Sequence, residues 1–438
     1  MPIDFTLSPE QRSLQEDTYA FAERVLAPIS AQIDAIADPI DAFRFTRAAY
    51  REMAKAGFTK SFIPVADGGL GFGLVDLALA VEELARVDVN VPTTLLASGV
   101  GLQPVIQFGD VAQRKLFLQP FIDDADGELL AAFAFTEVGG GANFDSADAE
   151  AGVQTFARRD GDAWVVTGQK HYTTSGSGWH GKGAHLYSVV CRTDPTKGAR
   201  ESLAVVMVPG GAAGVQVIDV YDKLGNRGVM SSRVHFEEVR VPANHLIGHP
   251  CQGLEIVSGA FSWTAALIAA ACVGVMRAAF EYAIDFAKSE RRLGSGPIIE
   301  HQNVGYMLAD IKMRIEAARY LTWKACHYLE QTDGRGEELA IMAKVYCSEL
   351  AVQVIYDAMR LVGVESYTKK TPLERLLRDA LVFPLYDGGN MGIRRRQLHA
   401  LFTEPGYDSM LAAQGRVPPW KEHEVLLASD TFLRGMLV

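Results

Sequence analysis

The hydrophobic pattern changes its period twice along this chain, and that change limits the folds open to it. Up to about residue 130 the apolar residues recur three and four positions apart, which is the period of an amphipathic helix. Short β-branched and aromatic runs then follow one another until about residue 248, and the helical period returns after them. The sequence therefore predicts an α+β fold with a helical domain over 1–130, a β domain over 131–248 and a helical domain over 249–438.

The middle zone contains at least three strand-like runs, which cover residues 163–167, 186–190 and 203–208. Turn signals such as Asp160-Gly161 separate them, and no helical pattern lies between them. This spacing is typical of an antiparallel barrel or sandwich, and we expect an antiparallel β-barrel.

The C-terminal zone consists of long helical segments joined by short turns, which predicts a four-helix bundle. The segments are 252–291, 298–330, 337–361, 373–383 and 388–401. Part of the first segment, from Ile256 to Met276, carries no charge and is long enough to cross a bilayer. It holds serine and threonine, however, and no basic loop or aromatic belt flanks it, so we expect a helix buried inside the bundle and no membrane partner.

Composition narrows the class of protein. Hydrophobic residues make up 48% of the chain, which excludes a disordered protein. There are 42 basic against 53 acidic residues, and no basic run is longer than 394–396, so we expect no nucleic-acid partner. The sequence has no HExxH motif, and His245 and His249 lie in an expected strand-exit loop, so no metal site is predicted.

Cysteine usage and the N-terminus bear on the compartment. The five cysteines form no CxxC pair, and an odd, scattered set is not typical of a disulfide framework. The first residues, MPIDFTLSPEQ, contain an acid and no long apolar run, so no secretory signal is expected. We therefore expect a cytoplasmic protein.

One local feature near the C-terminus carries chemistry. Asp387 lies in an apolar setting just before two glycines where a helix could begin, and Arg394 would then lie two turns further on nearly the same face. Such a pair can form a proton acceptor in a partly dry site. The alternative is an acid that favours a helix dipole beside a solvated basic turn, and this segment alone leaves both open.

At this point the sequence resembles the acyl-CoA dehydrogenase superfamily of flavoproteins over essentially its whole length. Five segments in the same order carry the resemblance, namely 63–71, 135–143, 168–174, 292–302 and 376–388. The resemblance implies a noncovalently bound FAD between the β domain and the C-terminal bundle, and a homotetramer.

The resemblance also assigns residues to the cofactor. Thr136 and Thr174 would bond the flavin ring, and Gly363 would belong to the cofactor site. Arg292 and Gln302 would contact the cofactor from a neighbouring subunit. Hydroxyls adjust the flavin without adding charge, and arginine neutralises a pyrophosphate.

Several positions depart from the pattern of the acyl-CoA dehydrogenases. Asp387 stands where those enzymes carry a glutamate, and Ala265 stands where they usually have an arginine. Ala142 and Met359 replace a serine and a glutamine that contact the dinucleotide in the family.

A better match within the superfamily is the group of nitroalkane oxidases, which the segments 261–267 and 385–397 resemble. This resemblance implies that Asp387 takes the substrate proton, that Arg394 is its partner, and that the hydroxyl of Thr264 bonds the carboxylate. The expected activity is FAD-dependent oxidation of neutral nitroalkanes to aldehydes or ketones, with release of nitrite and hydrogen peroxide and with dioxygen as electron acceptor. The alternatives are an acyl-CoA dehydrogenase, a flavin-dependent N-monooxygenase and a non-enzymatic flavin-binding protein.

Overall fold

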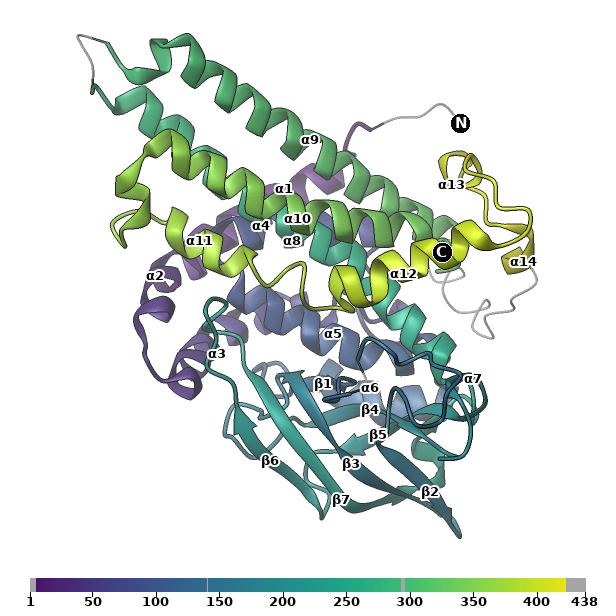
Figure 1. Cartoon of the computed structure of the whole chain (residues 1–438). Helices are drawn as coiled ribbons and strands as arrows, with labels where there is room; N and C mark the ends of the chain where they lie inside the picture. Colours follow the sequence, from purple (N-terminus) through teal and green to yellow (C-terminus); the bar gives the residue numbers. More distant parts are fainter. Residues whose placement is uncertain (1–4, 140, 293–295, 423–438) are drawn as a thin grey trace.

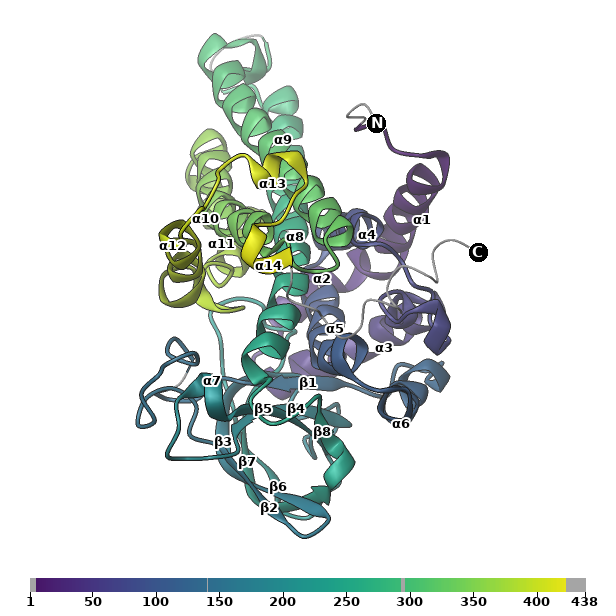
Figure 2. The same ribbon diagram turned by 90° about the vertical axis from the view of Figure 1, so that its right-hand side faces the viewer.

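A computed structural model describes residues 5–139, 141–292 and 296–422. Helices form the upper part of the molecule in Figure 1 and a β-sheet forms its lower end. In the view of Figure 2, turned by 90°, the sheet again lies below the helices, so the two layers are distinct.

The N-terminal part is helical, as the sequence predicts. It contains α1 (Pro9–Val25), α2 (Ala27–Ala35), α3 (Pro39–Lys55), α4 (Leu74–Val87), α5 (Asn90–Phe108) and α6 (Val111–Asp123). A capping box starts α1, because the Ser8 hydroxyl accepts from the backbone of Gln11 and the Gln11 side chain accepts from the backbone of Ser8. These helices pack around apolar residues that are almost completely buried, including Phe43, Met53 and Leu84.

The middle part is a single mixed sheet. Its strands are β1 (Ala131–Ala134), β2 (Phe156–Asp160), β3 (Ala163–Thr174), β4 (Leu186–Arg192), β5 (Leu203–Pro209), β6 (Val215–Val220), β7 (Ser231–Pro242) and β8 (Leu246–Ile247), with the short helix α7 (Ala199–Ser202) before β5. The strand order is β6-β7-β3-β2-β4-β5-β8, and β1 pairs with β4 in parallel.

The expected closed barrel is therefore wrong, because the sheet is open between β6 and β8. The β8 strand is only two residues long and pairs with β5 alone, so it offers little backbone for closure. The sheet is not purely antiparallel either, since β1 and β2 each pair with β4 in parallel. Alternating apolar residues predict strands well, but they do not decide whether the two edge strands meet.

The C-terminal part is built on three long helices, α8 (Gly253–Ser289), α9 (Gln302–Gln331) and α10 (Glu337–Val362), and α4 packs against α8 beside them. Shorter helices follow, namely α11 (Leu373–Ala380), α12 (Arg395–Thr403), α13 (Leu411–Gln414) and α14 (Pro419–Glu422). Both α8 and α10 are long and apolar enough to cross a membrane by composition, but 89% of the most apolar window of α8 is buried inside the protein, and 56% of that of α10. The expectation that α8 is a buried bundle helix is confirmed.

Two polar contacts hold the segment between α11 and α12 near the sheet. Asp379 at the end of α11 accepts a hydrogen bond from the backbone of Asn226, in the loop between β6 and β7, at 2.5 Å. Arg396 in α12 pairs with Asp145, in the loop after β1, at 2.7 Å. The chain from 381 to 394 therefore connects two points that are each anchored to the middle part.

Candidate active site

Asp387 lies in a tight turn between α11 and α12. Its φ is 52°, in the left-handed region, and Gly388 and Gly389 follow with φ of 88° and 59°. A single π-helical turn, Gly389–Arg394, then leads into α12. Such π turns occur often at functional sites, and here the glycines permit a backbone that side chains would disfavour. A Cβ at Gly388 would lie 3.1 Å from Nε of Arg394, so a side chain there would also crowd the arginine.

Both oxygens of the Asp387 carboxylate are bonded. The Thr264 hydroxyl on α8 donates to Oδ1 at 2.6 Å, and Nη2 of Arg394 donates to Oδ2 at 2.6 Å. The carboxylate is nearly dry, since the Asp387 side chain is only 6% exposed. The structure thus brings together the three catalytic residues named from the sequence.

Arg394 is completely buried and uses all three guanidinium nitrogens. Nε donates to the backbone carbonyl of Asp387 at 3.0 Å, and Nη2 also donates to the carbonyl of Phe261 at 3.1 Å. Nη1 donates to the Gln397 side chain at 3.3 Å, and the guanidinium stacks over the Phe261 ring at 5.3 Å. The interpretation of Arg394 as part of a solvated basic turn is therefore wrong, because its guanidinium is buried. A buried charge needs hydrogen-bond partners of this kind.

Sequence reasoning missed a second buried cation at this site. Lys344 of α10 is fully buried, and its Nζ donates to the carbonyl of Tyr386 and to Oδ1 of Asn390, both at 2.8 Å. Burial lowers the pKa of Lys344 to about 8, although the negative charge of Asp387 acts to raise this pKa. The sequence feature that could have indicated this residue is a lysine within the apolar face of a predicted helix, next to Ala343.

The expected flavin contacts Thr136 and Thr174 lie at one end of the sheet. Thr136 lies two residues after the end of β1, and its carbonyl accepts from the backbone of His171 at 2.7 Å, while Thr174 ends β3. Both residues are half-buried, and within the described ranges neither hydroxyl bonds to another residue. The hydroxyls of Thr173 and Ser175 beside Thr174 are buried without a hydrogen-bond partner in the same ranges. Free hydroxyls without charge fit the edge of a flavin ring, as expected for FAD.

The other three expected cofactor residues lie at the opposite end of the helical part. Arg292 follows α8, Gln302 begins α9 and Gly363 ends α10. A Cβ at Gly363 would lie 3.0 Å from Nη1 of Arg292, so these two are neighbours. Figures 1 and 2 place the connection between α8 and α9 far from the sheet. A single chain therefore does not bring this group to Thr136 and Thr174. The expected contact of Arg292 and Gln302 with a neighbouring subunit's cofactor remains a prediction.

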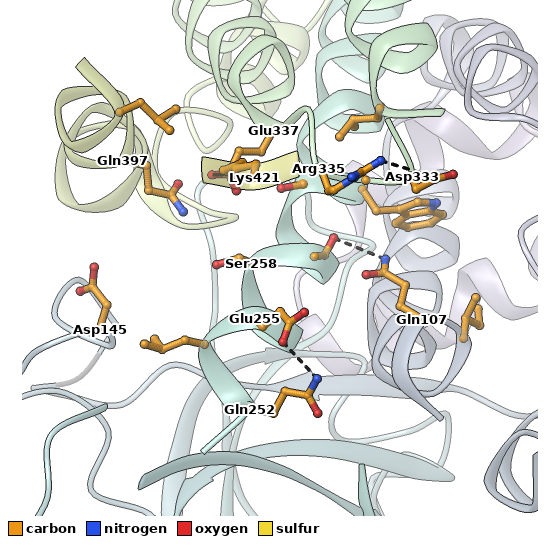
Figure 3. A pocket seen from close by; sticks show the side chains of 18 of the residues that line it. Gln107, Asp145, Gln252, Glu255, Ser258, Asp333, Arg335, Glu337, Gln397 and Lys421 are labelled. Atoms are coloured by element: carbon orange, nitrogen blue, oxygen red, sulfur yellow. Dashed lines mark hydrogen bonds and ion pairs between the residues drawn. The ribbon is translucent and has the colours of Figure 1, made fainter. Parts of the chain in front are cut away.

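A cavity of about 720 Å³ opens beside α8 and is also lined by residues of α12. Figure 3 shows polar side chains around it, from α5, α8, α12, α14 and the loop before α10. Its charged wall residues are partly paired, since Lys421 contacts Glu337 at 2.6 Å and Gln252 donates to Glu255 at 3.0 Å. Gln397 connects the two regions, because it lines the cavity and accepts from Arg394.

Comparisons with known proteins agree with this geometry. Three family models match in order: the N-terminal domain of acyl-CoA dehydrogenase over residues 8–125, the middle domain over 132–239 and the C-terminal domain over 251–400. Nitroalkane oxidase from Podospora anserina is 37% identical and covers 95% of this chain and 100% of the relative. Nitroalkane oxidase from Fusarium oxysporum is also 37% identical, over 94% of this chain and 98% of the relative.

A solved structure supports the same relationship at the level of the fold. An active-site mutant of nitroalkane oxidase, crystallised with 1-nitrooctane, superimposes with a TM-score of 0.89 at 35% identity. The match covers 94% of this chain and 100% of that one. The resemblance seen in the sequence is confirmed, and the chain belongs to the acyl-CoA dehydrogenase family of flavin-dependent oxidoreductases, in the branch of the nitroalkane oxidases.

Proposed function

We propose that this protein is an FAD-dependent nitroalkane oxidase. It converts neutral nitroalkanes into aldehydes or ketones and releases nitrite and hydrogen peroxide, with dioxygen as the electron acceptor. The observation that carries the proposal is the dry Asp387 carboxylate, held by Arg394 and Thr264. The relatives named nitroalkane oxidase and the structure crystallised with 1-nitrooctane support the substrate class.

Asp387 acts as the base that removes the α-proton of the nitroalkane. Each of its oxygens accepts one hydrogen bond and keeps further lone pairs for the incoming proton. Arg394 balances the carboxylate charge in a site with little water and fixes the direction of Oδ2. Thr264 fixes Oδ1, so the carboxylate is oriented before the substrate arrives.

The remaining residues concern the cofactor. When bound, FAD accepts the electrons of the deprotonated substrate and passes them to dioxygen. The free hydroxyls of Thr136 and Thr174 would hold the flavin ring at the end of the sheet. Asp387 and Ala265 stand where acyl-CoA dehydrogenases carry a glutamate and usually an arginine, and the shorter carboxylate of aspartate supports a small substrate without a CoA anchor.

The test is anaerobic mixing of the purified yellow protein with nitroethane. We expect the flavin to bleach with release of nitrite, and the yellow colour to return with hydrogen peroxide when air is admitted. Asp387→Asn should retain FAD and lose turnover by about 10³-fold or more, because the base is gone. Bleaching by a short acyl-CoA but not by nitroethane, or normal turnover in Asp387→Asn, contradicts the proposal.

A further inference from the structure

Lys344 contacts the turn that carries Asp387, although the lysine belongs to a different element, the helix α10. It lies in the interior of α10, and its ammonium donates to one acceptor before Asp387 in the chain and to one after it. One acceptor is the carbonyl of Tyr386, the residue before Asp387, and the other is the side chain of Asn390, three residues after it. The lysine therefore spans the left-handed part of the turn.

Asn390 extends this contact back to α10. Its Nδ2 donates to the Ser348 hydroxyl at 3.0 Å and to Glu349 at 3.1 Å, and the Asn390 side chain is buried. Both ends of the amide are thus bonded, and the turn is tied to one helix at three side chains. Networks of this kind lose their geometry when one member is removed, because the others are left unsatisfied.

The ammonium is also a charge in a dry region. Among the described residues no carboxylate forms an ion pair with Lys344, so neutral oxygens alone accept its hydrogen bonds. The charged and titratable groups that face it are Asp387 and Tyr386 of the turn, Cys272 of α8, Arg394 before α12 and Glu349 of α10. Glu349 is itself paired with Arg395 at 2.6 Å. Asp387, which Arg394 already pairs with, is therefore the other negative charge that faces the ammonium.

We propose that Lys344 is a positioning residue for the proton-accepting carboxylate: it fastens the turn around Asp387 and adds a second buried positive charge beside Arg394. The inference rests on the proposed function for its kinetic consequences, but not for its structural ones. Lysine burial without a carboxylate is costly, and the pKa of Lys344 is lowered accordingly. If the side chain at position 344 only filled space, a hydrophobic residue of the same volume would do so without the cost of burying a charge.

The test compares Lys344→Met with Lys223→Met, because Lys223 is another lysine whose pKa is lowered by burial. Among the described residues its ammonium donates only to the carbonyl of Val229, in the loop between β6 and β7, and it faces Asp379 rather than Asp387. Each variant is assayed with nitroethane and with its preformed anion, ethyl nitronate, which needs no base. We expect Lys344→Met to lose about tenfold or more in kcat/KM with nitroethane but less than about threefold with the nitronate.

A second measurement does not depend on turnover. Amide hydrogen exchange over residues 381–392 should speed up in Lys344→Met and stay at the wild-type rate in Lys223→Met. Lys344→Arg, which keeps the charge, should restore part of the nitroethane activity. Unchanged exchange, or equal losses with nitroethane and nitronate, would overturn the inference. If the wild type does not oxidise nitroethane but exchange is faster in Lys344→Met, the proposed function is refuted and the positioning role stands.

Discussion

At the scale of single residues, Thr264 makes the contact that its chemistry predicts. It lies 123 positions before Asp387, and its hydroxyl donates its single proton to the carboxylate at 2.6 Å, because the competing carbonyls of Ala260 and Phe261 are farther away, at 3.3 and 3.2 Å. A hydrogen bond to a buried charged group is worth about 1.5–3 kcal/mol, so Thr264→Ala should lower kcat/KM for nitroethane by about 10- to 100-fold. Thr264→Ser keeps the hydroxyl and should stay within about threefold of the wild type. Steady-state kinetics of the two variants check this, and an equal loss in both would show that the methyl group, not the hydroxyl, matters.

At the scale of elements, α9 supplies the cap of α4. The carboxylate of Glu330, in the last turn of α9, accepts from the backbone N–H of Leu74, and Gly73 provides no side-chain cap there. Burial raises the pKa of Glu330 to about 7 from 4.5. The folded state therefore binds more protons than the unfolded state between these values, and stability falls as pH rises through this window. Glu330→Gln keeps a neutral acceptor, so its Tm should exceed that of the wild type by a few degrees at pH 8 and match it at pH 4.5. An equal difference at both pH values in thermal unfolding contradicts this origin.

At the scale of the whole molecule, the cofactor residues form two groups at opposite ends. We propose a homotetramer in which Arg292 and Gln302 of one subunit reach the FAD of another; the exposed Tyr306 and Met313 on α9 provide apolar surface for such contacts. Arg292→Ala should then lose FAD during gel filtration while its own Asp387 site stays intact. Arg360→Ala is the matched control, since its side chain is 60% exposed near the same end of α10. Light scattering gives the mass and absorbance gives the bound flavin. A monomer, or equal FAD retention in the two variants, contradicts the arrangement.

The sequence by itself determined the features that arise from local interactions. The periods of the apolar residues predicted the long helices and the strands β3, β4 and β5, because hydrogen bonding within a helix and alternation within a strand are properties of short segments. The pairing of Asp387 with Arg394 was also within reach, since seven positions separate them. The family and its flavin chemistry followed from matching segments, and the comparisons confirm them.

Only the tertiary structure decided the features that depend on distant segments. The open sheet follows from which edge strands find partners, and the strand pattern is the same for a barrel. Lys344 joins the site from 42 positions before Tyr386, and its role depends on how α10 packs under the turn. The separation of Arg292 from Thr136 follows from the length and direction of α8. Packing brings these groups together or keeps them apart, and packing is set by the whole chain rather than by any segment of it.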